Sequence, residues 1–222
     1  MITVTGLSHR ILEIPELRIP AGRVAVIGPN GGGKTTLLRL LAGIDLPGEG
    51  EILIDGLPPR SREVGWVGEC PERNAIFGRV SDEIASPLRF RHDPCPLVDG
   101  RVKAFADDLG IGNLLDRGTG DLSTGQMVMV ALAAALIPGP DLLVLDETDS
   151  NLDMGTAMAV EGLTRAAPCS HVVRSTQRME LAAMSDHVLF LDGGRVLHSG
   201  TPATVFGALA GTSYFPPSWG CG

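Results

Sequence analysis

The segment from residue 28 to residue 35 has the composition of a phosphate-binding loop. It reads Gly-Pro-Asn-Gly-Gly-Gly-Lys-Thr and matches G-x-x-x-x-G-K-[ST] between an apolar run and a helical pattern. Glycines let the backbone curl so that successive N–H groups point at one anion, and the next helix N-terminus adds partial positive charge. Lys34 is expected to reach the β- and γ-phosphates of ATP, and the Thr35 hydroxyl to ligate Mg²⁺. The predicted nucleotide-binding residues of this loop are Asn30, Gly31, Gly32, Gly33, Lys34, Thr35 and Thr36.

Two adjacent carboxylates follow an apolar run farther along the chain. Residues 142–145 are Leu-Leu-Val-Leu, and Asp146 and Glu147 come directly after them. A buried parallel strand delivers such residues at its carboxyl end, where ligands gather in α/β sheets. We expect Asp146 to hold Mg²⁺, and Glu147 to orient and deprotonate the attacking water. A strand that runs into an acidic turn is common by itself, but its place downstream of a phosphate loop favours the catalytic interpretation.

A third segment, Leu-Ser-Thr-Gly-Gln at residues 122–126, precedes a long apolar helical pattern. Four segments of the chain resemble the motifs of ABC-type ATPases and occur in the same order, and the resemblance covers about residues 1–206. They are GPNGGGKTT, LSTGQ, LLVLDE and Ser-Asn-Leu-Asp at 150–153. LSTGQ is similar to the family's LSGGQ signature, with Thr124 where glycine is usual. The segment 150–153 resembles the D-loop that follows the catalytic glutamate in this family.

The resemblance implies a head-to-tail dimer, in which the signature of one subunit caps the ATP held by the other. Ser123, Gly125 and Gln126 are then nucleotide-binding residues, and a helix N-terminus at Ser123 suits an anion. The partner is a second copy or a different ABC ATPase, so a homodimer and a heterodimer both stay open. A transmembrane transporter subunit is the other implied partner, and it places the chain at the cytoplasmic face of the membrane as a peripheral protein.

Residues 64–72 and 76–85 resemble the Q-loop region of energy-coupling-factor ATPases, which power vitamin, cobalt or nickel importers. The segment 192–206 is similar to the ending of those proteins. Glu69 stands where that family has a glutamine that contacts Mg²⁺. Glu69 is therefore a candidate metal ligand, although a carboxylate there would repel the γ-phosphate.

Gln177 stands where the family has its switch histidine, and its amide can donate a hydrogen bond but cannot carry a proton. Because Glu69 and Gln177 depart from the family while Lys34, Asp146 and Glu147 are kept, we expect a slow ATPase. Alternatives are a weakly hydrolysing partner subunit and a soluble, non-transport ABC protein. Trp66 is the first aromatic residue, so adenine has no N-terminal ring to stack on unless His9 substitutes.

The elements that must position these residues alternate along the chain. Strands are expected at 23–27, 51–54, 63–67, 142–145, 171–174, 187–191 and 195–198, and helices at 34–42, 99–109, 125–137 and 154–166. This alternation predicts an α/β, P-loop NTPase core with a parallel-rich sheet. The predicted single ABC ATPase domain spans 1–222, with the core at 1–70 and 138–206. An inserted helical subdomain occupies 71–137, and 207–222 is predicted to be a loose tail.

Composition limits the other roles of the chain. The net charge of −8 and the pI of about 5.1 argue against nucleic acid as a partner. The cysteines Cys70, Cys95, Cys169 and Cys221 have no metal-ligand spacing and are expected to be free thiols. Residues 1–5 do not predict a signal peptide, and the longest apolar run, 127–137, is too short to span a bilayer and predicts a buried helix.

Overall fold

The computed structural model describes residues 1–219, and its largest element is a six-stranded sheet with the order β5-β6-β7-β3-β8-β9. The strands are β5 (Val64–Val67), β6 (Leu142–Asp146), β7 (His171–Ser175), β3 (Gly22–Ile27), β8 (His187–Asp192) and β9 (Arg195–Gly200). The neighbours from β5 to β8 pair in parallel, and β9 pairs antiparallel with β8. The predicted α/β fold with a mostly parallel sheet is confirmed.

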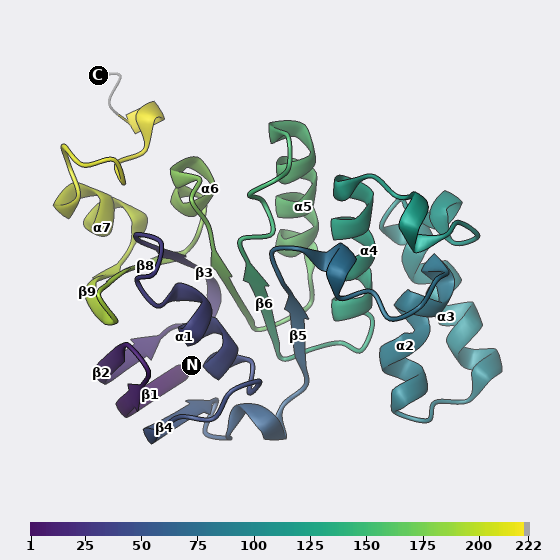
Figure 1. The fold of residues 1–222 in the computed structure, drawn as a ribbon, viewed down its shortest axis with the longest axis horizontal. Coiled ribbons are helices and arrows are strands. Elements are labelled where there is room, and N and C mark those ends of the chain that lie inside the picture. Colours follow the sequence, from purple (N-terminus) through teal and green to yellow (C-terminus); the bar gives the residue numbers. More distant parts are fainter. Residues whose placement is uncertain (220–222) are drawn as a thin grey trace.

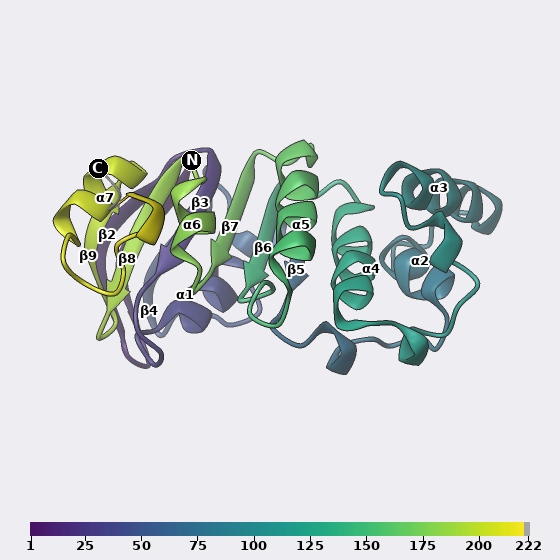
Figure 2. The same cartoon turned by 90° about the horizontal axis from the view of Figure 1, so that it is seen from above.

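Helices cover both faces of this sheet: α5 (Met154–Ala166) and α6 (Met179–Ala183) pack on one face, and α1 (Lys34–Leu41) packs on the other (Figure 2). The two faces of β6 belong to different cores. Val144 packs with the leucines of α1, whereas Leu143 packs with apolar residues of α5. Every residue of β6 is buried, which is why residues 142–145 are continuously apolar rather than alternating.

A second, three-stranded antiparallel sheet with the order β2-β1-β4 packs over α1. It consists of β1 (Ile2–His9), β2 (Leu12–Ile19) and β4 (Glu49–Ile54). The analysis of the sequence missed β1 and β2. Their buried positions alternate with exposed polar ones, as at Ile2, Val4 and Ile14, and this period of two was the available signal.

A helical region lies at the right of Figure 1, between β5 and β6 in the chain, where the sequence predicts a subdomain at 71–137. It contains α2 (Val80–Phe90), α3 (Cys95–Asp108) and α4 (Thr124–Leu136). These helices share an apolar core of their own, which includes Ile84 and Val102. The long apolar run predicted as a buried helix forms α4. Within residues 1–219 no helix is long and apolar enough to cross a membrane.

The C-terminal segment after α7 (Pro202–Ala208), for which the sequence predicts a loose tail at 207–222, makes aromatic contacts in its described part. The ring of Tyr214 meets Phe190 edge-on at 5.0 Å between centroids. Trp219 meets Phe206 in the same way at 5.3 Å. Aromatic side chains that bury apolar area hold this segment on β8 and α7. Residues 220–222, which include Cys221, lie outside the described residues.

Candidate functional site

The loop between β3 and α1 fits tightly against β8 at its start and against β2 at its end, and these contacts require glycine at both ends of the loop. A Cβ atom on Gly28 would lie 2.0 Å from the carbonyl oxygen of Leu191, and one on Gly33 would lie 2.7 Å from the Leu12 side chain. The φ angles of Gly28 and Gly33 are 140° and 104°, which side chains rarely allow. The glycines of the predicted phosphate loop therefore serve its close packing as well as its curvature.

The ammonium group of Lys34 is the cation at the centre of the site. Lys34 is 5% exposed, and its Nζ donates hydrogen bonds to the carbonyl oxygens of Gly28 at 3.0 Å and Pro29 at 3.1 Å. The same Nζ lies 3.4 Å from Oε1 of Glu147. These acceptors hold the charge beside the N-terminus of α1, where the helix dipole also attracts anions.

Thr35 and Asp146 meet across the site, as the sequence predicts. The Thr35 hydroxyl donates to Oδ1 of Asp146 at 3.2 Å. Ser175, at the end of β7, donates its hydroxyl to the same oxygen at 2.6 Å and accepts the backbone N–H of Glu147 at 2.9 Å. Sequence reasoning missed Ser175, because its contact with Asp146 depends on the pairing of β6 with β7.

Glu147 and Gln177 also lie together. The Gln177 amide donates from Nε2 to Oε1 of Glu147 at 3.1 Å and to Oδ1 of Asn30 at 2.9 Å. Glu147 has a φ of 48°, in the left-handed region that costs a residue with a side chain about 1 kcal/mol or more. The carboxylate of Glu147 thus lies between the Gln177 amide and the Lys34 ammonium.

A cavity of about 360 Å³ lies over these groups. It is lined by Ile11, Asn30, Gly31, Gly33, Lys34, Thr35, Thr36, Glu69, Asp146 and Glu147. Most of the residues predicted for the phosphate loop, the metal and the base therefore face one space. Ile11, from the turn between β1 and β2, is the apolar side chain among them, and sequence reasoning missed it. His9, suggested as a substitute for an aromatic residue, is not among the lining residues of the described chain.

The signature residues lie elsewhere. Ser123, Gly125 and Gln126 line a different cavity of about 330 Å³, beside the start of α5. The Ser123 hydroxyl and the Gln126 side chain form a capping box at the N-terminus of α4. A Cβ atom on Gly125 would lie 2.8 Å from Cγ2 of Thr156, so glycine permits this approach of the two helices.

Asp153, the last residue of the D-loop-like segment, caps α5. Its carboxylate accepts hydrogen bonds from the Thr156 N–H at 3.0 Å and from the Thr156 hydroxyl at 2.6 Å. The hydroxyl and the N–H of Thr156 lower the pKa of Asp153. This carboxylate is therefore committed to the helix N-terminus.

A glycine-rich loop between a parallel strand and a helix, facing two carboxylates at the end of a neighbouring strand, defines the class of P-loop nucleoside triphosphatases. Comparisons with known proteins then show the family. The family described as ABC transporter matches residues 12–150. The chain belongs to this family, and it is an ATP-binding subunit with ATPase activity coupled to transport.

Relatives from different transport systems match with similar identity. The Fe(3+) ions import ATP-binding protein FbpC of Photorhabdus laumondii is 33% identical over 90% of this chain, which spans 59% of that relative's length. The lipoprotein-releasing system ATP-binding protein LolD of Chromohalobacter salexigens is 34% identical over 84% of each chain. The structure of cbiO1 from Clostridium perfringens, part of the ABC transporter complex cbiONQ, has a TM-score of 0.82 and 26% identity over 93% of this chain and 90% of its own. The comparisons do not single out the energy-coupling-factor subtype.

Proposed function

We propose that this ATP-binding subunit hydrolyses Mg²⁺-ATP on the loop of residues 28–35, with Glu147 as the general base. The observation that carries the proposal is the convergence of a buried lysine, a threonine hydroxyl and two carboxylates on one cavity. Lys34 holds the β- and γ-phosphates, and Glu147 takes a proton from the attacking water. ATP turnover by the purified chain, with and without Mg²⁺, tests this function.

The oxygen groups of the cavity suit Mg²⁺, which prefers carboxylate, hydroxyl and phosphate ligands. Thr35 and Asp146 already contact each other at 3.2 Å, and Glu69 lines the same cavity. These three residues would hold the ion. When bound, Mg²⁺ would neutralise charge on the phosphates of ATP.

Glu69 is expected to raise the KM for ATP by repelling the triphosphate. In the Glu69→Gln variant we expect the KM for ATP to fall about 5-fold, because one negative charge leaves the cavity. The matched control is Glu72→Gln, which removes an exposed carboxylate nearby that does not line the cavity. Steady-state ATPase assays of both variants check this. An unchanged KM in Glu69→Gln would contradict the repulsion, and a higher KM would show that the Mg²⁺ ligand supplied by Glu69 outweighs it.

A second ABC ATPase completes the proposed site. The described residues that line the signature cavity include no lysine and no carboxylate, so Ser123 and Gly125 need a triphosphate held by another subunit. A head-to-tail dimer supplies it, as a homodimer or as a heterodimer. Altered residues at 69 and 177 favour a second candidate function, that of a weakly hydrolysing subunit paired with a more active partner.

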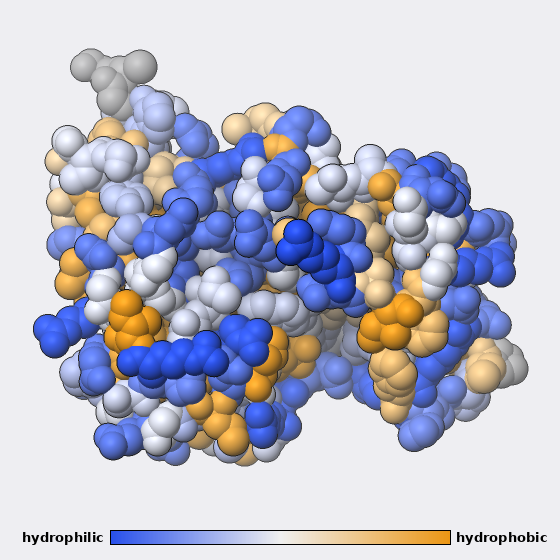
Figure 3. Space-filling view, in the orientation of Figure 1, coloured by the Kyte–Doolittle hydropathy of each residue, from blue (hydrophilic) through white to orange (hydrophobic). Residues whose placement is uncertain are grey.

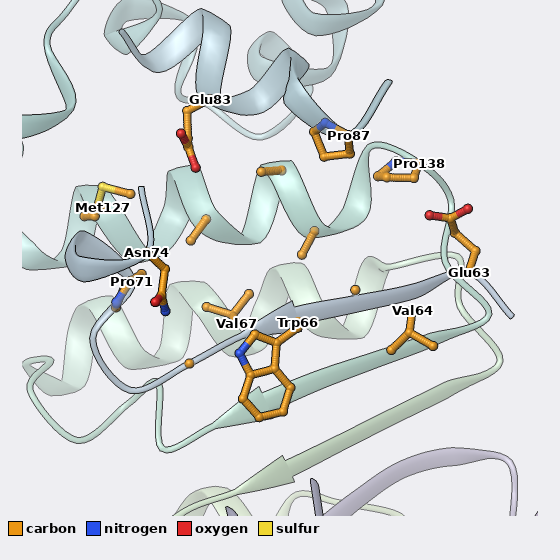
Figure 4. Close-up of a pocket in the computed structure, with 15 residues that line it drawn as sticks. Glu63, Val64, Trp66, Val67, Pro71, Asn74, Glu83, Pro87, Met127 and Pro138 are labelled. Atoms are coloured by element: carbon orange, nitrogen blue, oxygen red, sulfur yellow. The ribbon is translucent and has the colours of Figure 1, made fainter. Parts of the chain in front are cut away.

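The proposed membrane partner has a groove available on the chain. A cavity of about 340 Å³ lies between β5 and the helices α2 and α4, and Figure 4 shows Val67, Pro71 and Pro87 along it. The space-filling view is hollowed between the core and the helical region (Figure 3). Gly68 and Pro71 line the groove on either side of Glu69, so a partner seated there would contact the loop that enters the ATP cavity.

We further propose a transporter of the importer kind, with the chain as a peripheral protein at the cytoplasmic face of the membrane. The cbiO1 structure, which is part of a cbiONQ complex, supports an energy-coupling-factor type. Purification of the full chain from detergent-solubilised native membranes should bring an integral membrane protein with it. Recovery of the chain without one, and with nucleic acid or ribosomes instead, would favour the soluble alternative.

A further inference from the structure

A set of buried charged side chains lies next to the turn that carries Glu147. Asp149, Glu161 and Arg174 are 1%, 4% and 3% exposed. They come from the turn after β6, from α5 and from β7. Arg174 donates a hydrogen bond to Glu161, and its guanidinium lies 3.7 Å from Asp149. The proposed mechanism uses none of these three groups.

Stability alone does not account for these charges. Taking a carboxylate or a guanidinium out of water costs folding free energy that pairing rarely returns in full. Two residues before Arg174 on β7, Val172 packs with Val160 of α5 in an ordinary apolar layer. Apolar side chains in place of these three charged ones would therefore be enough to pack α5 on β7. The buried charges call for a role in specifying a conformation.

The charged set connects the two turns of the catalytic site. Asp149 accepts a hydrogen bond from the Thr176 hydroxyl at 2.5 Å. The same hydroxyl accepts the backbone N–H of Arg178 at 3.0 Å, and the Arg178 guanidinium donates to the carbonyl oxygen of Leu152. Asp149 and Leu152 belong to the turn after Glu147, and Thr176 and Arg178 stand on either side of Gln177. The two turns are therefore joined behind the site.

The front of the site shows why such a connection matters. Gln177 reaches Glu147 with a single hydrogen bond of 3.1 Å, and both side chains are exposed to solvent in part. Glu147 also keeps a φ of 48°, which persists only where the surroundings hold it. On one side, the Ser175 hydroxyl accepts a hydrogen bond from the backbone N–H of Glu147. Asp149, two residues farther on, is anchored to Thr176 on the other side.

We infer that Asp149 and Thr176 are positioning residues, which fix the turn of Glu147 against the turn of Gln177. The inference rests on the proposed role of Glu147 as the base. The guanidinium groups of Arg174 and Arg178 lie 3.7 Å and 3.9 Å from the Asp149 carboxylate, and Glu161 pairs with Arg174. A base that is displaced by a fraction of an ångström loses its alignment with the attacking water, and the rate falls steeply with such displacement.

The test replaces Thr176 by valine in the full-length chain, which removes the bridging hydroxyl and keeps the shape. The matched control is Thr164→Val on α5, where another buried hydroxyl donates to the Glu161 carbonyl oxygen at 2.9 Å. Thr176→Val loses two hydrogen bonds and Thr164→Val loses one, so we expect both melting temperatures to fall, and that of Thr176→Val to fall further. Only Thr176→Val should speed hydrogen exchange of the amides of residues 147–152, by about 10-fold. Only Thr176→Val should lower kcat, by roughly 10-fold, at an unchanged KM for ATP.

The two readouts separate this inference from the function on which it rests. Exchange at residues 147–152 that matches the wild type and the control would overturn the positioning role, whatever the turnover. A fall in kcat of equal size in both variants would also overturn it, because a general loss of stability would then suffice. A wild-type chain that does not hydrolyse ATP would instead refute the proposed role of Glu147, and the exchange measurement would still decide whether the turns are joined.

Discussion

Replacing Lys34 by alanine should abolish detectable Mg²⁺-dependent ATP binding, with an affinity loss of at least about 100-fold. The side chain is nearly buried, and among the described residues that line the cavity Lys34 alone carries a positive charge. Without it, Asp146, Glu147 and Glu69 would face the triphosphate with only backbone N–H groups and Mg²⁺ to offset their charge. Repulsion inside a partly enclosed cavity is stronger than in water.

The chain offers a clean control for this substitution. It contains two lysines, and Lys103 is exposed on α3, away from the lining of the cavity. Lys103→Ala changes the net charge by the same amount and should bind ATP as the wild type does. Titration calorimetry with Mg²⁺-ATP measures both variants, and circular dichroism checks that each is folded. ATP binding by Lys34→Ala at wild-type strength would refute the proposed nucleotide site.

The loop and the carboxylates could be predicted because their signals are local. The glycines, Lys34 and Thr35 are neighbours in the chain, and the strand that delivers Asp146 and Glu147 is continuously apolar since both its faces are buried. Residues that depend on tertiary approach carried no such signal. Ser175 reaches Asp146 only because β6 and β7 are paired in the sheet, and a single sequence does not give that pairing.

Two other features of the structure depend on contacts between residues far apart in the chain. The segment after Ala208 lacks periodicity and so predicts a loose tail, but Tyr214 and Trp219 find aromatic partners on β8 and α7. Arg174 sits in a strand that otherwise reads as apolar, and its partners Asp149 and Glu161 are distant in the chain. In both cases long-range side-chain contacts decide the outcome, and the order of residues along the chain does not reveal them.

The second large effect concerns Glu147, whose replacement by glutamine should lower ATP turnover by about 1,000-fold while ATP binding is kept. Glutamine has nearly the same shape and can still contact the Gln177 amide through its oxygen, but it cannot accept a proton from water. The Glu147 carboxylate lies 3.4 Å from Nζ of Lys34 and competes with the phosphates for this cation. The substitution removes that competition. Binding should therefore be equal or tighter.

Because hydrolysis is what releases the proposed head-to-tail contact, Glu147→Gln should accumulate as an ATP-bound dimer, which light scattering after size exclusion detects. Glu51→Gln, which changes an exposed carboxylate on β4, should remain like the wild type in turnover and in oligomeric state. If the natural dimer is a heterodimer, the trapped species forms only when the second ABC ATPase is added. Turnover and assembly unchanged by Glu147→Gln would mean that the chain binds ATP without using it, as a regulatory partner does. A trapped dimer would instead identify the Glu147 carboxylate as the group whose action on ATP allows the two subunits to separate.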